Sequence, residues 1–216
     1  GIYHDHFSNT TTALPKRAKL QLAAWEYKVF IFEKEAPVVQ RKVLSATQTK
    51  TGFRVVTNEG QIDFTAHASN AVEVTFNPIG QSNPPSYAIA QEAQKVKAKF
   101  ADGKLSTVWS TGELTVTVYK SPFQIYYSYQ NKPLISEEAG YYDDGTFMGF
   151  RFNLHDGEML TGGGSRAGGI NRRGKRFELY NKASYGYEDS AAQMYYSLPI
   201  VLSNRKYMLA FDNGAN

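Results

Sequence analysis

Apolar and polar residues alternate in short segments along most of the chain. Residues 113–120 show this most clearly, because Leu114, Val116 and Val118 would face one side of a strand and the residues between them the other. Similar segments follow one another, separated by turns rich in Gly, Pro, Asn and Asp, at residues 38–47, 53–57, 61–66, 72–76, 96–100, 104–110, 123–129 and 147–154. This cadence predicts an all-β protein, built as a sandwich or a barrel. It lacks the strand-then-long-helix rhythm of a parallel α/β sheet.

The start of the chain is a lead-in whose pattern is mixed. Residues 17–32 include apolar positions at helical spacing, whereas residues 29–32 are strand-like, so both interpretations stay open. No linker-like stretch and no fixed-period repeat divides the chain. We therefore expect one β-sandwich domain over residues 1–216, with a lead-in over 1–35 and a Gly-, Arg- and Tyr-rich loop region over 160–190.

The amino-acid composition excludes several kinds of functional site. The 216 residues include 15 Tyr, 13 Phe and 18 Gly but no Cys, which favours strands and turns and excludes disulfides, thiolate metal sites and a thiol nucleophile. A formal net charge of +4 is low for a nucleic-acid-binding protein, and no apolar run approaches the roughly 20 residues that span a bilayer. On composition we expect neither a nucleic-acid nor a membrane partner.

The first residues bear on where the protein is found. They lack the basic and apolar regions of a signal peptide, and an initial Gly without Met suggests that the chain belongs to a longer protein. The compartment stays open, with the periplasm or the cell exterior favoured over the cytoplasm.

Candidate catalytic and metal-binding side chains are few. The paired carboxylates at 137–138 would point to opposite faces of a strand, and those at 143–144 precede a glycine in a turn motif. His4 and His6 have a spacing that could bind a metal on a strand, but they lie at a terminus. We therefore predict no catalytic residue, no metal site and no cofactor in this chain.

The loop region 160–190 is the most informative segment. Gly169, Gly174 and Lys175 match the spacing of a phosphate-binding loop, but Arg176 stands where a Ser or Thr would hold magnesium. Interleaved basic residues and tyrosines could bind nucleic acid. Aromatic faces and polar side chains on a glycine-rich loop could instead contact a carbohydrate. A fourth interpretation is that the glycines only shape turns and the arginines are solvated.

Two runs of residues in and after this loop resemble a known family. They are Gly162-x-Gly164-x-Arg166 followed by INRRGKRFELYN at 170–181, and MYYSLPI at 194–200. Together they are similar to the N-terminal domain of glycoside hydrolase family 31, which includes α-glucosidases and α-xylosidases. Residues 150–159 and 207–213 resemble the segments that flank these motifs in the family.

The resemblance implies a β-sandwich of the galactose-mutarotase-like (supersandwich) type. In the family the catalytic carboxylates lie in a later (β/α)8 barrel, and a loop of the sandwich completes the sugar-binding pocket. The resemblance therefore implies a non-catalytic N-terminal domain of a retaining α-glycosidase, whose partners are the C-terminal barrel of the same polypeptide and an oligosaccharide substrate. It also implies that Arg166, Asn181 and Tyr187 bind substrate at or near the pocket, with Arg166 alternatively supporting the loop's own backbone.

Three positions depart from the family pattern. Ser165 stands where the family has Glu, and Tyr180 replaces Trp but keeps an aromatic face. Ala183 stands where the family has an Asp that contacts sugar hydroxyls. Loss of that carboxylate implies an altered specificity or a contact supplied from elsewhere.

Two other functions are consistent with the residues. A free-standing carbohydrate-binding module would use exposed aromatic side chains as its platform, such as Tyr126, Tyr127, Tyr141 and Tyr142. A basic nucleic-acid-binding sandwich would use the cations of the loop region.

Overall fold

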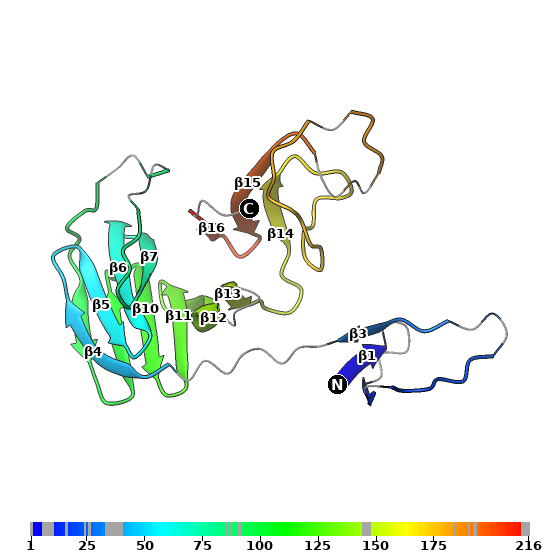
Figure 1. Cartoon of the computed structure of the whole chain (residues 1–216). Coiled ribbons are helices and arrows are strands. Elements are labelled where there is room, and N and C mark those ends of the chain that lie inside the picture. Colours follow the sequence, from blue (N-terminus) through cyan, green and yellow to red (C-terminus); the bar gives the residue numbers. More distant parts are fainter. Residues whose placement is uncertain are drawn as a thin grey trace. The chain divides into compact units, whose positions relative to one another are not determined.

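The computed structural model describes residues 2–5, 11–15, 17–23, 25, 27–32, 41–84, 86, 88–89, 92–143, 148–183, 185–189, 191 and 194–212. These form two compact units, Gly1–Val38 and Val39–Asn216, and each is described by itself. The described residues form strands and no helix, which confirms the all-β prediction (Figure 1). None of them belongs to a helix long and apolar enough to cross a membrane. The expectation of a single domain over 1–216 stays a prediction.

The first unit contains a small antiparallel sheet. Its strands are β1 (Ile2–Asp5), β2 (Thr11–Ala13) and β3 (Phe30–Phe32), in the order β2-β1-β3. Strand β3 lies where the strand-like interpretation placed it, and the helical interpretation of the segment before it is wrong for the described residues.

The described residues of the second unit form three antiparallel sheets. The four-stranded sheet has the order β4-β5-β6-β7, with β4 (Val43–Gln48), β5 (Gly52–Thr57), β6 (Gly60–Ala68) and β7 (Ala71–Pro78). The six-stranded sheet has the order β13-β12-β11-β10-β9-β8, so each strand pairs with the one that follows it in the chain. Its strands are β8 (Lys99–Asp102), β9 (Ser106–Ser110), β10 (Leu114–Lys120), β11 (Phe123–Tyr129), β12 (Lys132–Asp143) and β13 (Met148–Asn153). The third sheet has the order β14-β15-β16, with β14 (Leu160–Gly164), β15 (Ser197–Ser203) and β16 (Met208–Ala210).

The core lies between the four-stranded and the six-stranded sheets, as expected of a sandwich. The alternation in β10 buries Val116 and Val118 completely, because successive residues of a strand face opposite sides. On the facing sheet Phe53 and Phe64 are register partners, and their rings stack with centroids 4.2 Å apart. Trp109 of β9 packs 6.1 Å from the Phe53 ring and joins the two layers.

One buried cation binds both layers of the sandwich. The Arg41 side chain donates from Nε to Glu59 Oε2 (2.8 Å), from Nη1 to Ala139 O (2.8 Å) and from Nη2 to Tyr141 O (2.5 Å). The two carbonyl groups flank Gly140, which adopts a φ of +68° where the pairing of β12 with β13 changes register. A Cβ at Gly140 would lie 3.0 Å from Arg41 Nη1, so the bulge and the arginine fit each other closely.

A carboxylic acid is also buried on β12. Glu137 is 2% exposed, whereas Glu138 on the other face lies 4.0 Å from Arg151, so the two carboxylates point apart as predicted. The Tyr127 hydroxyl donates to Glu137 Oε1, and Oε2 has no hydrogen-bond partner among the residues that the structure describes. Burial raises the pKa of Glu137 to about 7, although the Tyr127 hydrogen bond and the Arg41 charge both lower it.

Candidate functional site

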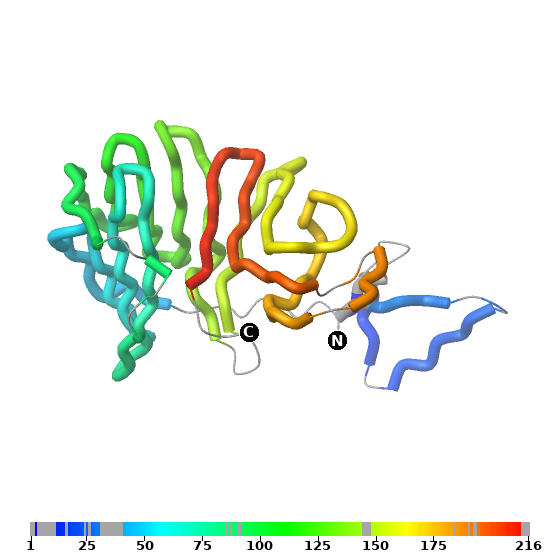
Figure 2. Tube along the Cα trace, turned by 90° about the horizontal axis from the view of Figure 1, so that it is seen from above, coloured from blue at the N-terminus to red at the C-terminus, as the bar shows by residue number. Residues whose placement is uncertain are grey.

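The glycine-rich segment begins as a strand. The described residues of the segment between β14 and β15, yellow to orange in Figure 2, lie outside the sheet that these two strands form. Gly162 and Gly164 are paired with β15 and have φ values of +108° and +84°. A Cβ would lie 2.3 Å from Ile200 O at the first position and 2.4 Å from Tyr196 O at the second. Only glycine allows the two backbones to approach this closely.

Replacing Gly164 by alanine is therefore expected to destabilise the chain by about 2–3 kcal/mol, because positive φ and a backbone collision add. Gly186→Ala is the matched control, since Gly186 has a φ of +70° but no atom within 4 Å of an added Cβ. Its expected cost is about 1 kcal/mol. Urea unfolding of both variants measures the difference, and equal losses would contradict the collision.

Arg166, one of the predicted substrate-binding residues, turns toward the loop itself. Its Nε donates to Gly163 O (3.0 Å), and its Nη2 donates to Glu178 O (2.8 Å) and to Ser197 Oγ (3.0 Å). The guanidinium also lies 5.1 Å from the centre of the Phe177 ring. Partial burial, together with the neighbouring Arg172 charge, lowers the pKa of Arg166. Of the two roles expected for Arg166, these contacts favour support of the loop's own backbone over contact with substrate.

Asn181 fastens the far end of the same loop. Its Oδ1 accepts a hydrogen bond from Ser197 N (2.6 Å), and the Ser197 hydroxyl is within 3.3 Å of Tyr180 O. Ser197 is buried at the start of β15. Arg166 and Asn181 therefore converge on Ser197, and we call these three residues the Ser197 clamp. Whether Arg166 or Asn181 touches a sugar stays a prediction.

Other cations of the segment also bind its backbone. Arg172 donates to Gly162 O (3.1 Å) and Gly169 O (2.8 Å), and Lys175 donates to Gly168 O (2.9 Å). The phosphate-loop interpretation needs a helix after its glycines, and residues 165–183 contain none. Arg166 and Arg172 thus shape the loop, which differs from the solvated-arginine interpretation for these two residues, whereas Arg176 is exposed.

Arg173 donates to the backbone carbonyls of His155 (2.6 Å) and Glu158 (3.1 Å). The buried carboxylate of Glu158 joins the residues before the segment to those after it. Glu158 Oε1 accepts from the hydroxyls of Ser203 (2.5 Å) and Tyr207 (2.5 Å), and Oε2 accepts from His155 N (2.9 Å). Burial alone would raise the pKa of Glu158, but these hydrogen bonds and the Arg205 charge hold the pKa below its ordinary value. Both oxygens are occupied, so Glu158 serves as a fastening group rather than a general acid.

Tyr187, the third predicted site residue, remains open to solvent. Tyr187 is 53% exposed and Tyr185 is 89% exposed, and both rings meet the ring of Tyr195, which is 47% exposed. The ring centres lie 6.5 Å apart for Tyr187 and Tyr195 and 6.4 Å apart for Tyr185 and Tyr195, with interplanar angles of 84° and 89°. We call these three residues the tyrosine cluster. Tyr195 was not predicted as a site residue, because its run resembles a strand that here starts only at Ser197.

The tyrosines expected of a free-standing module do not form one platform. Tyr127 packs against the core and binds Glu137, while its neighbour Tyr126 lies on the opposite face and contacts Tyr119. Tyr141 stacks on Phe76 at 4.9 Å. The expectation of a joint platform is therefore wrong, because alternation along β11 separates adjacent residues.

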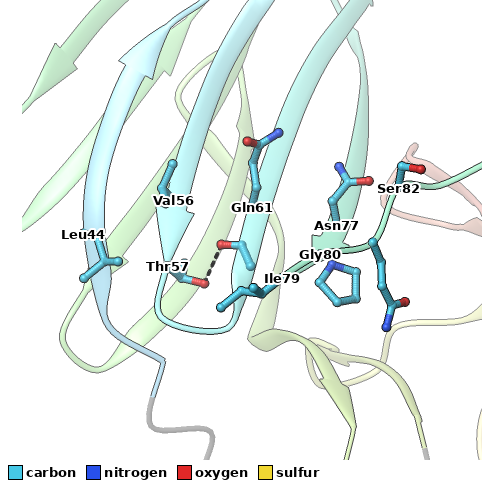
Figure 3. A pocket seen from close by; sticks show the side chains of 11 residues that line it. Leu44, Val56, Thr57, Gln61, Asn77, Ile79, Gly80 and Ser82 are labelled. Atoms are coloured by element: carbon cyan, nitrogen blue, oxygen red, sulfur yellow. Dashed lines mark hydrogen bonds between the residues drawn. The ribbon is translucent and has the colours of Figure 1, made fainter.

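A hollow of about 650 Å³ lies elsewhere, at the four-stranded sheet (Figure 3). Its lining carries no charged side chain and consists of Leu44, Val56, Thr57, Gly60, Gln61, Asn77, Pro78, Ile79, Gly80, Gln81 and Ser82. Gln61 and Asn77 both donate to Asp63 Oδ2, and Thr57 donates to Gly60 O. The hollow therefore offers no acid–base pair. The described residues also hold no group of three His, Asp or Glu able to bind a metal ion.

Comparison with solved structures relates the fold to known enzymes. A GH31 dextranase of Flavobacterium johnsoniae, complexed with glucose or with isomaltotriose, aligns with TM-scores of 0.70 and 0.69 and 22% and 21% identity, over 80% of this chain and 22% of that one. The cycloalternan-forming enzyme of Listeria monocytogenes aligns at 0.64 with 19% identity, over 78% and 17% of the two chains. The GH31 α-xylosidase of Xanthomonas citri aligns at 0.55 with 21% identity, over 72% and 17%. The chain thus spans about a fifth of the length of these relatives.

Comparison at the level of sequence gives a more specific result. No curated protein matches the chain significantly. Residues 61–216 match the family of the glycosyl hydrolase 31 N-terminal galactose mutarotase-like domain, which confirms the resemblance found in the motifs and the galactose-mutarotase-like type of the sandwich. Because this match covers most of the chain and the solved structures share its fold, the chain belongs to glycoside hydrolase family 31, within its N-terminal galactose-mutarotase-like domain.

Proposed function

We propose that this chain is the non-catalytic N-terminal domain of a retaining α-glycosidase that hydrolyses α-glucosidic or related bonds. In this proposal the catalytic carboxylates belong to a C-terminal barrel of the same polypeptide, and residues 162–187 complete the sugar-binding pocket. One observation carries the second part. The loop is held on strands β14 and β15 by side chains that bind backbone, while Tyr185 and Tyr187 stay exposed to solvent.

The roles of the predicted site residues follow from this arrangement. Asn181 and Arg166 act as positioning residues, because their polar groups hold Ser197 and the loop carbonyls. Tyr187 offers an exposed ring and is the proposed sugar contact. Ala183 has no polar side chain, so a carboxylate that binds sugar hydroxyls must come from another part of the enzyme.

The test uses the polypeptide encoded by the reading frame that contains this chain, assayed with aryl α-glucosides and α-xylosides. Asn181→Ala removes the acceptor for Ser197 N–H and is expected to lower kcat/KM at least about tenfold, equivalent to about 1.4 kcal/mol. Asn181→Asp keeps an acceptor oxygen and is expected to retain most of the activity.

Asn153→Ala is the matched control, since Asn153 is an exposed residue whose amide donates to Ser136 Oγ on the six-stranded sheet. Its kcat/KM should equal that of the wild type. Equal activities for Asn181→Ala and Asn153→Ala at matched urea midpoints would overturn the role of the loop. A reading frame that encodes no barrel would overturn the proposed enzyme.

A further inference from the structure

We propose that the tyrosine cluster of Tyr185, Tyr187 and Tyr195 binds the apolar face of a neutral pyranose ring in an oligosaccharide. This inference rests on the proposed function, because it names the part of the loop that meets the ligand. It assigns sugar contact to Tyr185 and Tyr195 as well as to Tyr187.

The clamp explains how the cluster is assembled. The bond between Asn181 Oδ1 and Ser197 N joins residues 16 positions apart in sequence and closes the segment that carries all three tyrosines. On the other side, Ser165 N donates to Tyr196 O (2.8 Å), which holds the chain next to Tyr195 against the start of the loop. The two residues that follow Tyr195 are therefore both anchored, and the rings of Tyr185 and Tyr187 pack edge-on to the ring of Tyr195.

The exposure of the cluster indicates a ligand rather than a core. Tyr195 and the two rings in edge contact with it remain between 47% and 89% exposed, so most of their apolar surface is open to solvent. Tyrosines combine an apolar face with a hydroxyl that can donate or accept. A pyranose with equatorial hydroxyls matches this combination, because its axial C–H bonds form flat apolar faces and its rim carries hydroxyls.

The charges beside the cluster favour a neutral ligand. Lys182 precedes the cluster, and Glu188 and Asp189 follow Tyr187 directly. All three are exposed. Because charges of both signs lie next to the rings, they create no field of one sign that would attract an anionic or a cationic ligand.

The experiment measures binding by the 216-residue chain with saturation-transfer NMR, using isomaltotriose and maltotriose as probes. The wild type is expected to bind with a Kd in the millimolar range, and Tyr185→Ala and Tyr195→Ala should each weaken binding about tenfold. Tyr119→Ala is the matched control, since Tyr119 is an exposed tyrosine in edge contact with Tyr126 on another surface.

Absence of saturation transfer to the wild type, or equal binding by Tyr185→Ala, Tyr195→Ala and Tyr119→Ala, would overturn the assignment. If such a result accompanied a loss of activity in Asn181→Ala, the proposed function would stand and the exposed rings would instead cover a protein surface. If binding followed the tyrosines while Asn181→Ala stayed fully active, the cluster would be a sugar site outside the catalytic pocket.

Discussion

Arg41→Ala is expected to lower the free energy of unfolding by about 3–5 kcal/mol. The substitution leaves the carbonyls of Ala139 and Tyr141 without their donor, and each unpaired buried carbonyl costs about 1–3 kcal/mol. It also removes a guanidinium that lies 4.9 Å from the centre of the Phe76 ring. Urea unfolding monitored by the fluorescence of the buried Trp109 measures the loss.

The control for this prediction is Arg54→Ala. Arg54 pairs with Asp63 at 2.6 Å, but its side chain is 44% exposed. Exposed ion pairs contribute about 0–1 kcal/mol. If Arg41→Ala prevents folding, Arg41→Lys supplies the measurement, because a single ammonium cannot reproduce the three-way contact and an intermediate loss is expected. Similar stabilities for Arg41→Lys, Arg54→Ala and the wild type would contradict the role of Arg41.

Glu137→Gln is expected to change how stability depends on pH. The folded chain holds a proton on Glu137 up to a pKa of about 7, whereas the ordinary value is 4.5. Between these two values the folded state binds a proton that the unfolded state has lost, so the free energy of unfolding falls as pH rises and levels off above pH 7. This contribution amounts to about 3 kcal/mol. A glutamine stays neutral at every pH and lacks it.

The measured quantity is the stability of the variant minus that of the wild type, taken from urea unfolding between pH 4.5 and 8. This difference removes the opposite contributions of Asp102 and Glu158, whose pKa values lie below their ordinary values. The difference should shift in favour of Glu137→Gln by about 3 kcal/mol across the window. Glu138→Gln, an exposed neighbour on the other face, should show no such shift. A constant difference for Glu137→Gln would show that Glu137 is ionised throughout.

Strands and core were predictable from the sequence because their signal is local. In β10 the alternation of Leu114, Val116 and Val118 alone indicates a strand and the face that is buried. The loop region could likewise be located from the sequence, since its Gly- and Arg-rich composition differs from that of the rest of the chain. The start of β14 within that region was missed, because three successive glycines rarely form a strand and here do so with positive φ values.

The hydrogen-bond partners of the polar loop residues could not be predicted from local sequence patterns. Arg166 and Asn181 were identified as important, but the direction of their side chains depends on Ser197, which lies 31 and 16 positions away. Tyr195 became a candidate only when the loop brought it against Tyr185 and Tyr187.

By itself the sequence determined an all-β chain with a sandwich core and a distinctive loop related to glycoside hydrolase family 31. Only the tertiary structure decided which charged groups are buried and what the loop's polar residues bind. The physical reason is one of range. Alternation and turn residues act over a few positions, whereas Arg41 meets the carbonyls of Ala139 and Tyr141 across 98 and 100 positions, where only the packing of two sheets can bring them together.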